Sequence, residues 1–357
     1  MPSIFLPPKV GKSVTFFRDL VHMAPSADDH HPAVRCAIGV AVPLVVVLVL
    51  GRLDLAIFAI FGAFAGIYGR NEPHRQRLAT QFRGGGLMLA VILAAILTSR
   101  ADLGSWTLVL LTSIVAGLGT FMAGVFRLRP GGSLFHIFAF AAIASVPGHP
   151  PLWQALSIAI ATVVLALLLG QLGNASPRFR TGWARQAAAP PGLHVPALAR
   201  NAILYFVAAA LAGTIATALG IGHAYWAMVA ATVPLVGQSA RARVNRGLQR
   251  VLGTLAGLVL TSAILLAGLA DWQLIVVIAG AQFAAEMFIQ RQYALAQVFV
   301  TPLALVGTQL AHAGDPTQLL ADRAVETLIG AFVGVALVLA LHLRQQARRT
   351  PEPLSWA

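Results

Sequence analysis

Residues 36–51 read CAIGVAVPLVVVLVLG, a run without a single charged side chain. A helix needs about 20 apolar residues to cross the hydrocarbon core of a membrane, and this run supplies most of one span. The rest of the chain has the same character. Of its 357 residues, 58% are hydrophobic and only 10% are charged, whereas soluble domains carry about 25% charged residues. We therefore expect an all-α integral membrane protein and exclude the soluble and disordered classes.

Comparable apolar runs recur along the whole chain, separated by short polar or basic stretches. Several runs are shorter than a straight span requires, so their boundaries are approximate. Together they predict about twelve transmembrane helices, at residues 33–51, 54–69, 84–99, 104–125, 133–147, 152–173, 200–220, 224–238, 250–269, 272–289, 292–311 and 324–343.

The basic residues predict the orientation of these helices, because Lys and Arg gather in cytoplasmic loops. With the N-terminus inside, all of the 25 Lys and Arg residues except Arg52, Arg100 and Arg323 fall on the inner side. We therefore expect both termini in the cytoplasm and a multi-pass protein of the bacterial inner membrane. The net charge of +13 is then mainly a consequence of topology, so we expect membrane lipid and not nucleic acid as a partner.

The two halves of the chain resemble each other. PAVR at 32–35 is similar to PALAR at 196–200, and Arg83 corresponds to Arg250. Because six helices is an even number, we expect two parallel repeats related by a pseudo-two-fold axis along the membrane normal. The expected organisation is a cytoplasmic N-terminal segment at 1–31, a first six-helix repeat at 32–173, a cytoplasmic linker at 174–199, a second repeat at 200–343 and a cytoplasmic tail at 344–357.

The most specific motif lies in the second half. WAMVAATVP at 226–234 precedes four arginines and the stretch RVLGTLAG at 250–257. This pattern resembles the fusaric-acid-resistance-like (FUSC) family, and the first half departs from it, with Phe58 in place of Trp226. The resemblance implies an inner-membrane protein related to bacterial aromatic-acid exporters and similar to the plant aluminium-activated malate transporters, which are anion channels. It implies no particular substrate.

Arginines at the start of two helices are the first candidates for a transport pathway. Arg246 and Arg250 lie at the cytoplasmic start of the helix at 250–269, where free N–H groups also favour an anion. Arg83 precedes three glycines that let a ligand approach the backbone. A guanidinium there can bind a carboxylate in a bidentate way. The alternative is that these arginines anchor the topology by contacting lipid phosphate.

Glu286 is the second candidate, since it lies about fourteen residues, or about 21 Å, into its helix. An ionised carboxylate at that depth is costly and should face protein or water. It would serve either as a proton carrier that couples export to the proton gradient, or as a structural hydrogen-bond anchor. As an anchor it would contact Arg291 or an arginine of the preceding loop.

Other candidates carry weaker signals. Trp226 belongs either to an aromatic belt at the outer interface or to the wall of a vestibule, and Pro234 breaks a helix and so frees carbonyl groups near a binding site. Two glycine pairs have the spacing of close helix packing, Gly253 with Gly257 and Gly330 with Gly334.

The chain contains no nucleotide-binding, dinucleotide-binding or nucleophile-elbow motif and only one cysteine. We therefore expect no enzyme, no cofactor and no metal site. The expected function is export of organic anions, with aromatic carboxylic acids favoured and proton coupling open. The alternatives are a passive anion channel and a non-transporting scaffold that binds anionic lipid or a partner protein. Whether the protein is a monomer or a homodimer stays open.

Overall fold

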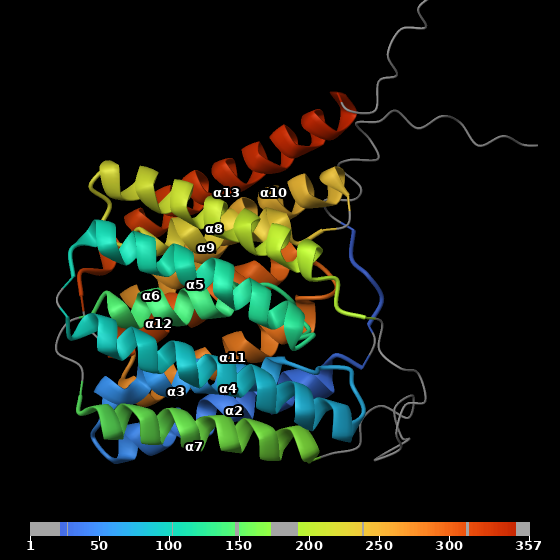
Figure 1. The fold of residues 1–357 in the computed structure, drawn as a ribbon. Helices are drawn as coiled ribbons and strands as arrows, with labels where there is room; N and C mark the ends of the chain where they lie inside the picture. Colours follow the sequence, from blue (N-terminus) through green and yellow to red (C-terminus); the bar gives the residue numbers. More distant parts are fainter. Residues whose placement is uncertain are drawn as a thin grey trace, which may run out of the picture.

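The computed structural model describes residues 22–26, 28–101, 103–146, 150–172, 192–237, 239–311 and 314–347. Within these ranges every regular element is a helix. Most of the expected N-terminal segment, linker and tail falls outside the described residues. Figure 1 shows the helices side by side in one bundle. The sequence-based assignment to the all-α class is therefore confirmed.

The first half contains helices at each of its six expected positions. A short broken helix, built from η1, α3 and η2, occupies the expected segment 54–69. The elements are α2 (His30–Val49), η1 (Leu53–Leu55), α3 (Ala56–Ala63), η2 (Phe64–Ile67), α4 (His74–Ser99), α5 (Ser105–Val125), α6 (Leu134–Ala144) and α7 (Leu152–Gln171).

The second half repeats this order. Its second helix is also short, and it ends in a 3-10 turn at Pro234, because proline lacks the N–H that would continue the α-helix. The elements are α8 (Val195–Ala218), α9 (Tyr225–Thr232), η4 (Val233–Leu235), α10 (Ala240–Leu266), α11 (Asp271–Phe288), α12 (Tyr293–Ala311) and α13 (Pro316–Ala347).

Three helices begin well before their apolar runs. α4 begins at His74 and α10 at Ala240, each about ten residues earlier than expected, and α13 begins at Pro316 instead of 324. In α4 and α10 the added residues include three arginines each, and because arginine is a good helix former the helix extends through charged turns that are too polar to be counted in the apolar run.

In the part of the chain that the structure describes, eight helices are long and apolar enough to cross a membrane, namely α2, α4, α5, α7, α8, α10, α12 and α13. Leu53–Ile67, Leu134–Ala144 and Tyr225–Leu235 are shorter apolar segments. The molecule is therefore a helical protein with several potential membrane spans. The count of twelve spans and the orientation stay predictions.

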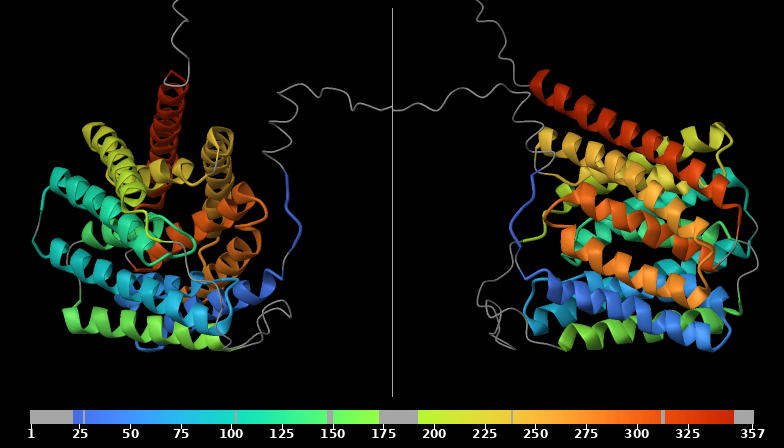
Figure 2. Two further views of the ribbon diagram at one scale, coloured as in Figure 1. Left: turned by 45° about the vertical axis from the view of Figure 1, so that its right-hand side comes forward. Right: turned by 180° about the vertical axis from the view of Figure 1, so that it is seen from behind.

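The two halves contact each other through matching pairs of helices. α5 of the first half packs along α8, and α11 of the second half packs along α2; Figure 2 shows the second contact from behind. Inside each half the partners also match, since α4 packs on α6 as α10 packs on α12, and α7 packs on α3 as α13 packs on α9.

Glycines allow the closest of these contacts. A Cβ at Gly62 would lie 2.8 Å from the carbonyl oxygen of Ala159 between α3 and α7, and a Cβ at Gly330 would collide with the carbonyl of Ala227 between α13 and α9. In the first contact the glycine lies on the short helix, and in the second it lies on the long helix that packs against the short one.

Candidate functional site

A cavity of about 480 Å³ lies between helices of the two halves. One end reaches the loops around residues 69–72, 129–131 and 289–290, which we call the basic end. From there the cavity extends inward between α3, α6, α9, α12 and α13. Its inner walls are mainly apolar and aromatic, with Phe61, Phe64, Phe135, Phe138, Trp226 and Leu303 among the lining residues.

Arg250 lines this cavity. It is 3% exposed, and its Nη1 donates a hydrogen bond of 2.8 Å to Oε1 of Gln297 on α12. Tyr293 lies close to it, with 3.5 Å between Nη1 and the phenol oxygen. Arg246, one turn before Arg250, places its guanidinium 4.2 Å from the centre of the Tyr293 ring. Two guanidinium groups thus meet one tyrosine at the basic end.

Arg250 has unused hydrogen-bonding capacity, since its Nε has no hydrogen-bond partner among the described residues. A guanidinium has five N–H groups in a planar fork. A carboxylate that enters from the basic end can therefore bind Arg250 without displacing Gln297.

Glu286 also lines the cavity and is 5% exposed. Its carboxylate pairs with Nη1 of Arg70, whose Nη2 donates bonds of 2.8 Å to the Glu286 carbonyl and to Oδ1 of Asp29. The expected partner, Arg291 or an arginine of the preceding loop, is therefore wrong. Arg70 follows the short segment Leu53–Ile67 in the other half of the chain. The two residues are far apart in the sequence, so no local sequence pattern predicts their contact.

Arg291 lies beside the segment that leads into α2. Its Nε donates to the carbonyl oxygen of Ala24 at 3.1 Å, and its own carbonyl accepts from the Ala24 N–H at 3.0 Å. Arg291 is not among the residues that line the cavity. Its contacts hold the N-terminal segment against the turn between α11 and α12.

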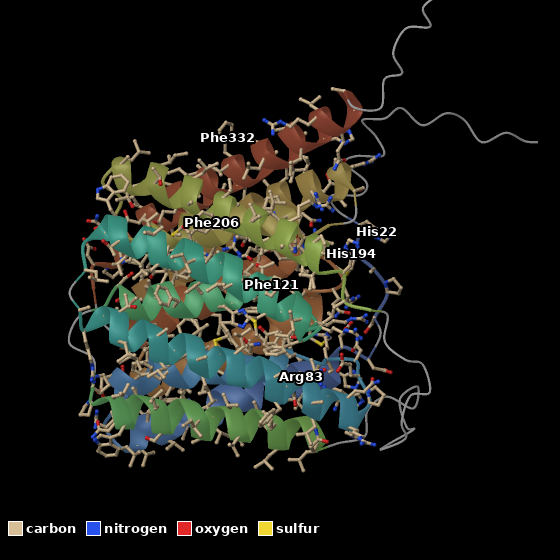
Figure 3. All side chains as sticks on the ribbon, in the orientation of Figure 1. His22, Arg83, Phe121, His194, Phe206 and Phe332 are labelled. Atoms are coloured by element: carbon tan, nitrogen blue, oxygen red, sulfur yellow. The ribbon has the colours of Figure 1, made fainter. Side chains whose placement is uncertain are left out.

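Arg83 is exposed on α4 and does not line the cavity; Figure 3 shows it at the front of the bundle. The buried arginine of α4 is Arg77, which sequence reasoning did not single out. It donates to the carbonyl oxygens of Gly69, Glu72 and Gly170 at 3.3, 2.8 and 2.7 Å. These bonds tie α4 to the end of α7.

Trp226 is 1% exposed, so its assignment to an interfacial belt is wrong. By contrast, Trp106, Trp153 and Trp272 are 58%, 69% and 59% exposed. Trp226 lines the cavity, with its ring centre 4.4 Å from that of Phe138.

Two further charged residues, Arg323 and Glu326, are buried on α13. The topology assigns Arg323 to an outer loop, whereas it lies inside α13 and is 0% exposed. Its guanidinium lies 3.7 Å from the centre of the Trp226 ring. Glu326, one turn further along, is also 0% exposed. Their spacing of three residues places both on one helix face. This spacing is the sequence pattern from which a shared buried face could have been predicted.

Pro234 and the predicted packing glycines lie at helix contacts around the cavity. Pro234 lies between Gly247 of α10 and Gly334 of α13, with its Cδ 3.0 Å from the Cβ position of Gly334. Gly330 faces Ala227, and Gly334 faces Ala231. Gly253 faces the backbone of Ala294, and Gly257 faces Thr301 and Val298 on α12.

Comparison with known proteins places this arrangement in context. Residues 209–337 match the family described as "Fusaric acid resistance protein-like". The family resemblance read from the sequence is confirmed. A protein of Bacillus subtilis (strain 168) described as the uncharacterized membrane protein YvaC is 32% identical over 158 residues, which are 44% of this chain and 25% of that protein. The chain thus covers about a quarter of that relative's length. No solved structure matches the chain.

The family match includes α9, α10 and α12 and most of α13, and so contains Trp226, Arg246, Arg250 and Arg323. Arg70 and the phenylalanines of α3 and α6 lie outside the matched residues. Among the described residues, no group of three or more His, Cys, Asp or Glu side chains is arranged to hold a metal ion.

Proposed function

We propose that this protein exports small organic anions across the bacterial inner membrane and that the cavity is their binding site. The observation that carries the proposal is the buried Arg250 at the basic end of a cavity lined by aromatic rings. A guanidinium binds carboxylates with directional hydrogen bonds, and an apolar pocket receives the rest of the molecule. The combination favours aromatic carboxylates.

The proposed topology has twelve spans in two parallel six-helix repeats, with both termini in the cytoplasm. The matching helix pairs of the two halves support the repeat, and the basic loops support the orientation. In this orientation the basic end faces the cytoplasm, where Arg129 and Arg246 raise the local concentration of anions. A single chain then holds a complete cavity between its two halves.

The energy source distinguishes two versions of the proposal. If Glu286 carries a proton, export is coupled to the proton gradient. The contact of Glu286 with Arg70 favours the passive version, in which the negative-inside potential drives each anion outward by about 2.3 kcal/mol per 100 mV. In that version Glu286 is a structural partner of Arg70.

The test is the flux of labelled benzoate from proteoliposomes that contain the full chain, with a pH gradient, with a membrane potential, and with neither. The passive version predicts flux that follows the potential and is retained by Glu286→Gln. Accumulation driven by the pH gradient and lost in Glu286→Gln would instead identify a proton-coupled exporter. Absence of flux under all three conditions, for benzoate and a panel of other aromatic acids, would reject transport and favour the membrane scaffold.

A further inference from the structure

Arg323 differs from the other buried arginines in its hydrogen bonding. Arg70, Arg77 and Arg250 each donate at least one bond of 2.8 Å or less to a protein oxygen. Nε, Nη1 and Nη2 of Arg323 have no hydrogen-bond partner among the described residues, although the side chain is 0% exposed. Its guanidinium carbon lies 3.7 Å from the centre of the Trp226 ring.

Such a group is costly in a folded protein. A buried charge without hydrogen bonds loses its hydration without compensation, and even one unsatisfied donor costs about 1–3 kcal/mol. Glu326 does not remove this cost by a direct ion pair, because both of its carboxylate oxygens lack hydrogen-bond partners in the described structure. The cost is repaid when a ligand supplies the missing acceptors.

The position of Arg323 indicates which ligand fits. Arg323 and Trp226 both line the cavity, and stacking on the indole occupies one face of the guanidinium and leaves the N–H groups in its plane available. That edge matches the two oxygens of a carboxylate. Phe138, whose ring is 4.4 Å from Trp226, extends the apolar wall beside it.

We infer that Arg323, held against Trp226, is a second binding site that takes the carboxylate of an organic anion deeper in the cavity than Arg250. The inference rests on the proposed function and extends it, because it divides the passage into two cationic sites. Arg250 receives the anion at the basic end, and Arg323 binds it in the aromatic inner part.

The test measures binding of benzoate to the purified full chain in nanodiscs by titration calorimetry. We expect Arg323→Gln to weaken binding at least about tenfold, which corresponds to about 1.4 kcal/mol. Arg323→Lys keeps the charge but loses the planar fork, so it should give an intermediate affinity. Arg83→Gln removes an exposed arginine outside the cavity and is the matched control, with unchanged affinity.

A spectroscopic measurement on the otherwise unaltered site keeps the inference testable if Arg323→Gln does not fold. In a chain whose other five tryptophans are replaced by phenylalanine, saturating benzoate should shift the emission of Trp226. Benzamide, the neutral analogue, and inorganic phosphate should not. No shift with benzoate, an equal shift with benzamide or phosphate, or wild-type affinity in Arg323→Gln would overturn the inference.

Flux measured in parallel separates this inference from the proposed function. Wild-type flux with unchanged binding in Arg323→Gln would reject Arg323 as a binding residue and leave transport in place. Binding that depends on Arg323, without flux in any condition, would support the site and reject transport.

Discussion

The contact of α13 with α9 in the second half has its counterpart in the contact of α7 with α3 in the first half. At the first of these contacts Arg323 of α13 lies 3.7 Å from the centre of the Trp226 ring of α9. At the second, Gly62 of α3 packs against Ala159 and Thr162 of α7. The two pairs of helices therefore bring different side chains together.

The difference extends to the cavity walls. The phenylalanines of the inner wall come from α3, η2 and α6 of the first half, together with Arg70 and Arg129 at the basic end, whereas the second half contributes Trp226, Tyr293 and the arginines of α10 and α13. Thr120 on α5 of the first half donates a 2.8 Å hydrogen bond to Ser133 within the same half, whereas Glu286 on α11 of the second half pairs with Arg70 of the other half. The two halves thus contribute different side chains to one cavity.

The largest expected effect tests the shared packing. Gly330→Leu and Gly62→Leu should both prevent formation of a stable bundle, because even a Cβ at either position meets the backbone of the neighbouring helix. Extra methylene groups in a packed core already cost about 1–3 kcal/mol each time they are inserted, and a leucine side chain adds several carbon atoms where there is no room for one. The measurement is the yield and melting temperature of the purified protein in detergent.

Gly86→Leu and Gly280→Leu are the matched controls, one in each half, because no atom lies within 4 Å of a Cβ at either position. They should purify like the wild type. Suppose that Gly330→Leu has the same melting temperature as Gly280→Leu, while Gly62→Leu has a lower melting temperature than Gly86→Leu. That result would show that the two halves are not packed alike.

The next effect concerns the bond network that joins the halves. Arg70→Gln should lower the free energy of unfolding by about 3–5 kcal/mol, because it breaks two buried ion pairs, those of Arg70 with Glu286 and with Asp29. Glu286→Gln should lower the free energy of unfolding by less, because Arg70 still donates hydrogen bonds to Asp29 and to the backbone carbonyl of residue 286. Unfolding in detergent by increasing SDS provides the comparison.

Arg52→Gln is the control for that series. Its ion pair with Asp54 is 35% and 42% exposed at the two side chains, so it should contribute no more than about 1 kcal/mol. Equal losses in Arg70→Gln and Arg52→Gln would contradict the assignment of a buried network between the halves.

Sequence patterns were sufficient to predict where the helices lie, but not which residues far apart in the sequence contact each other. The apolar runs located a helix at each expected position, because helix burial in lipid depends on local composition. Glu286 was recognised as a candidate by its depth, yet its partner Arg70 lies 216 residues away. Arg323 was misplaced because one charge at the edge of an apolar run is compatible with either a loop or a buried helix turn.

The most direct test of the account compares efflux of labelled benzoate from proteoliposomes containing Arg250→Gln and Arg83→Gln. The two arginines correspond in the sequence, but only Arg250 lines the cavity. We predict that Arg250→Gln lowers the initial rate about tenfold or more, equivalent to about 1.4 kcal/mol of lost interaction, while Arg83→Gln keeps the wild-type rate. Equal rates in the two variants would contradict passage of the anion through the cavity.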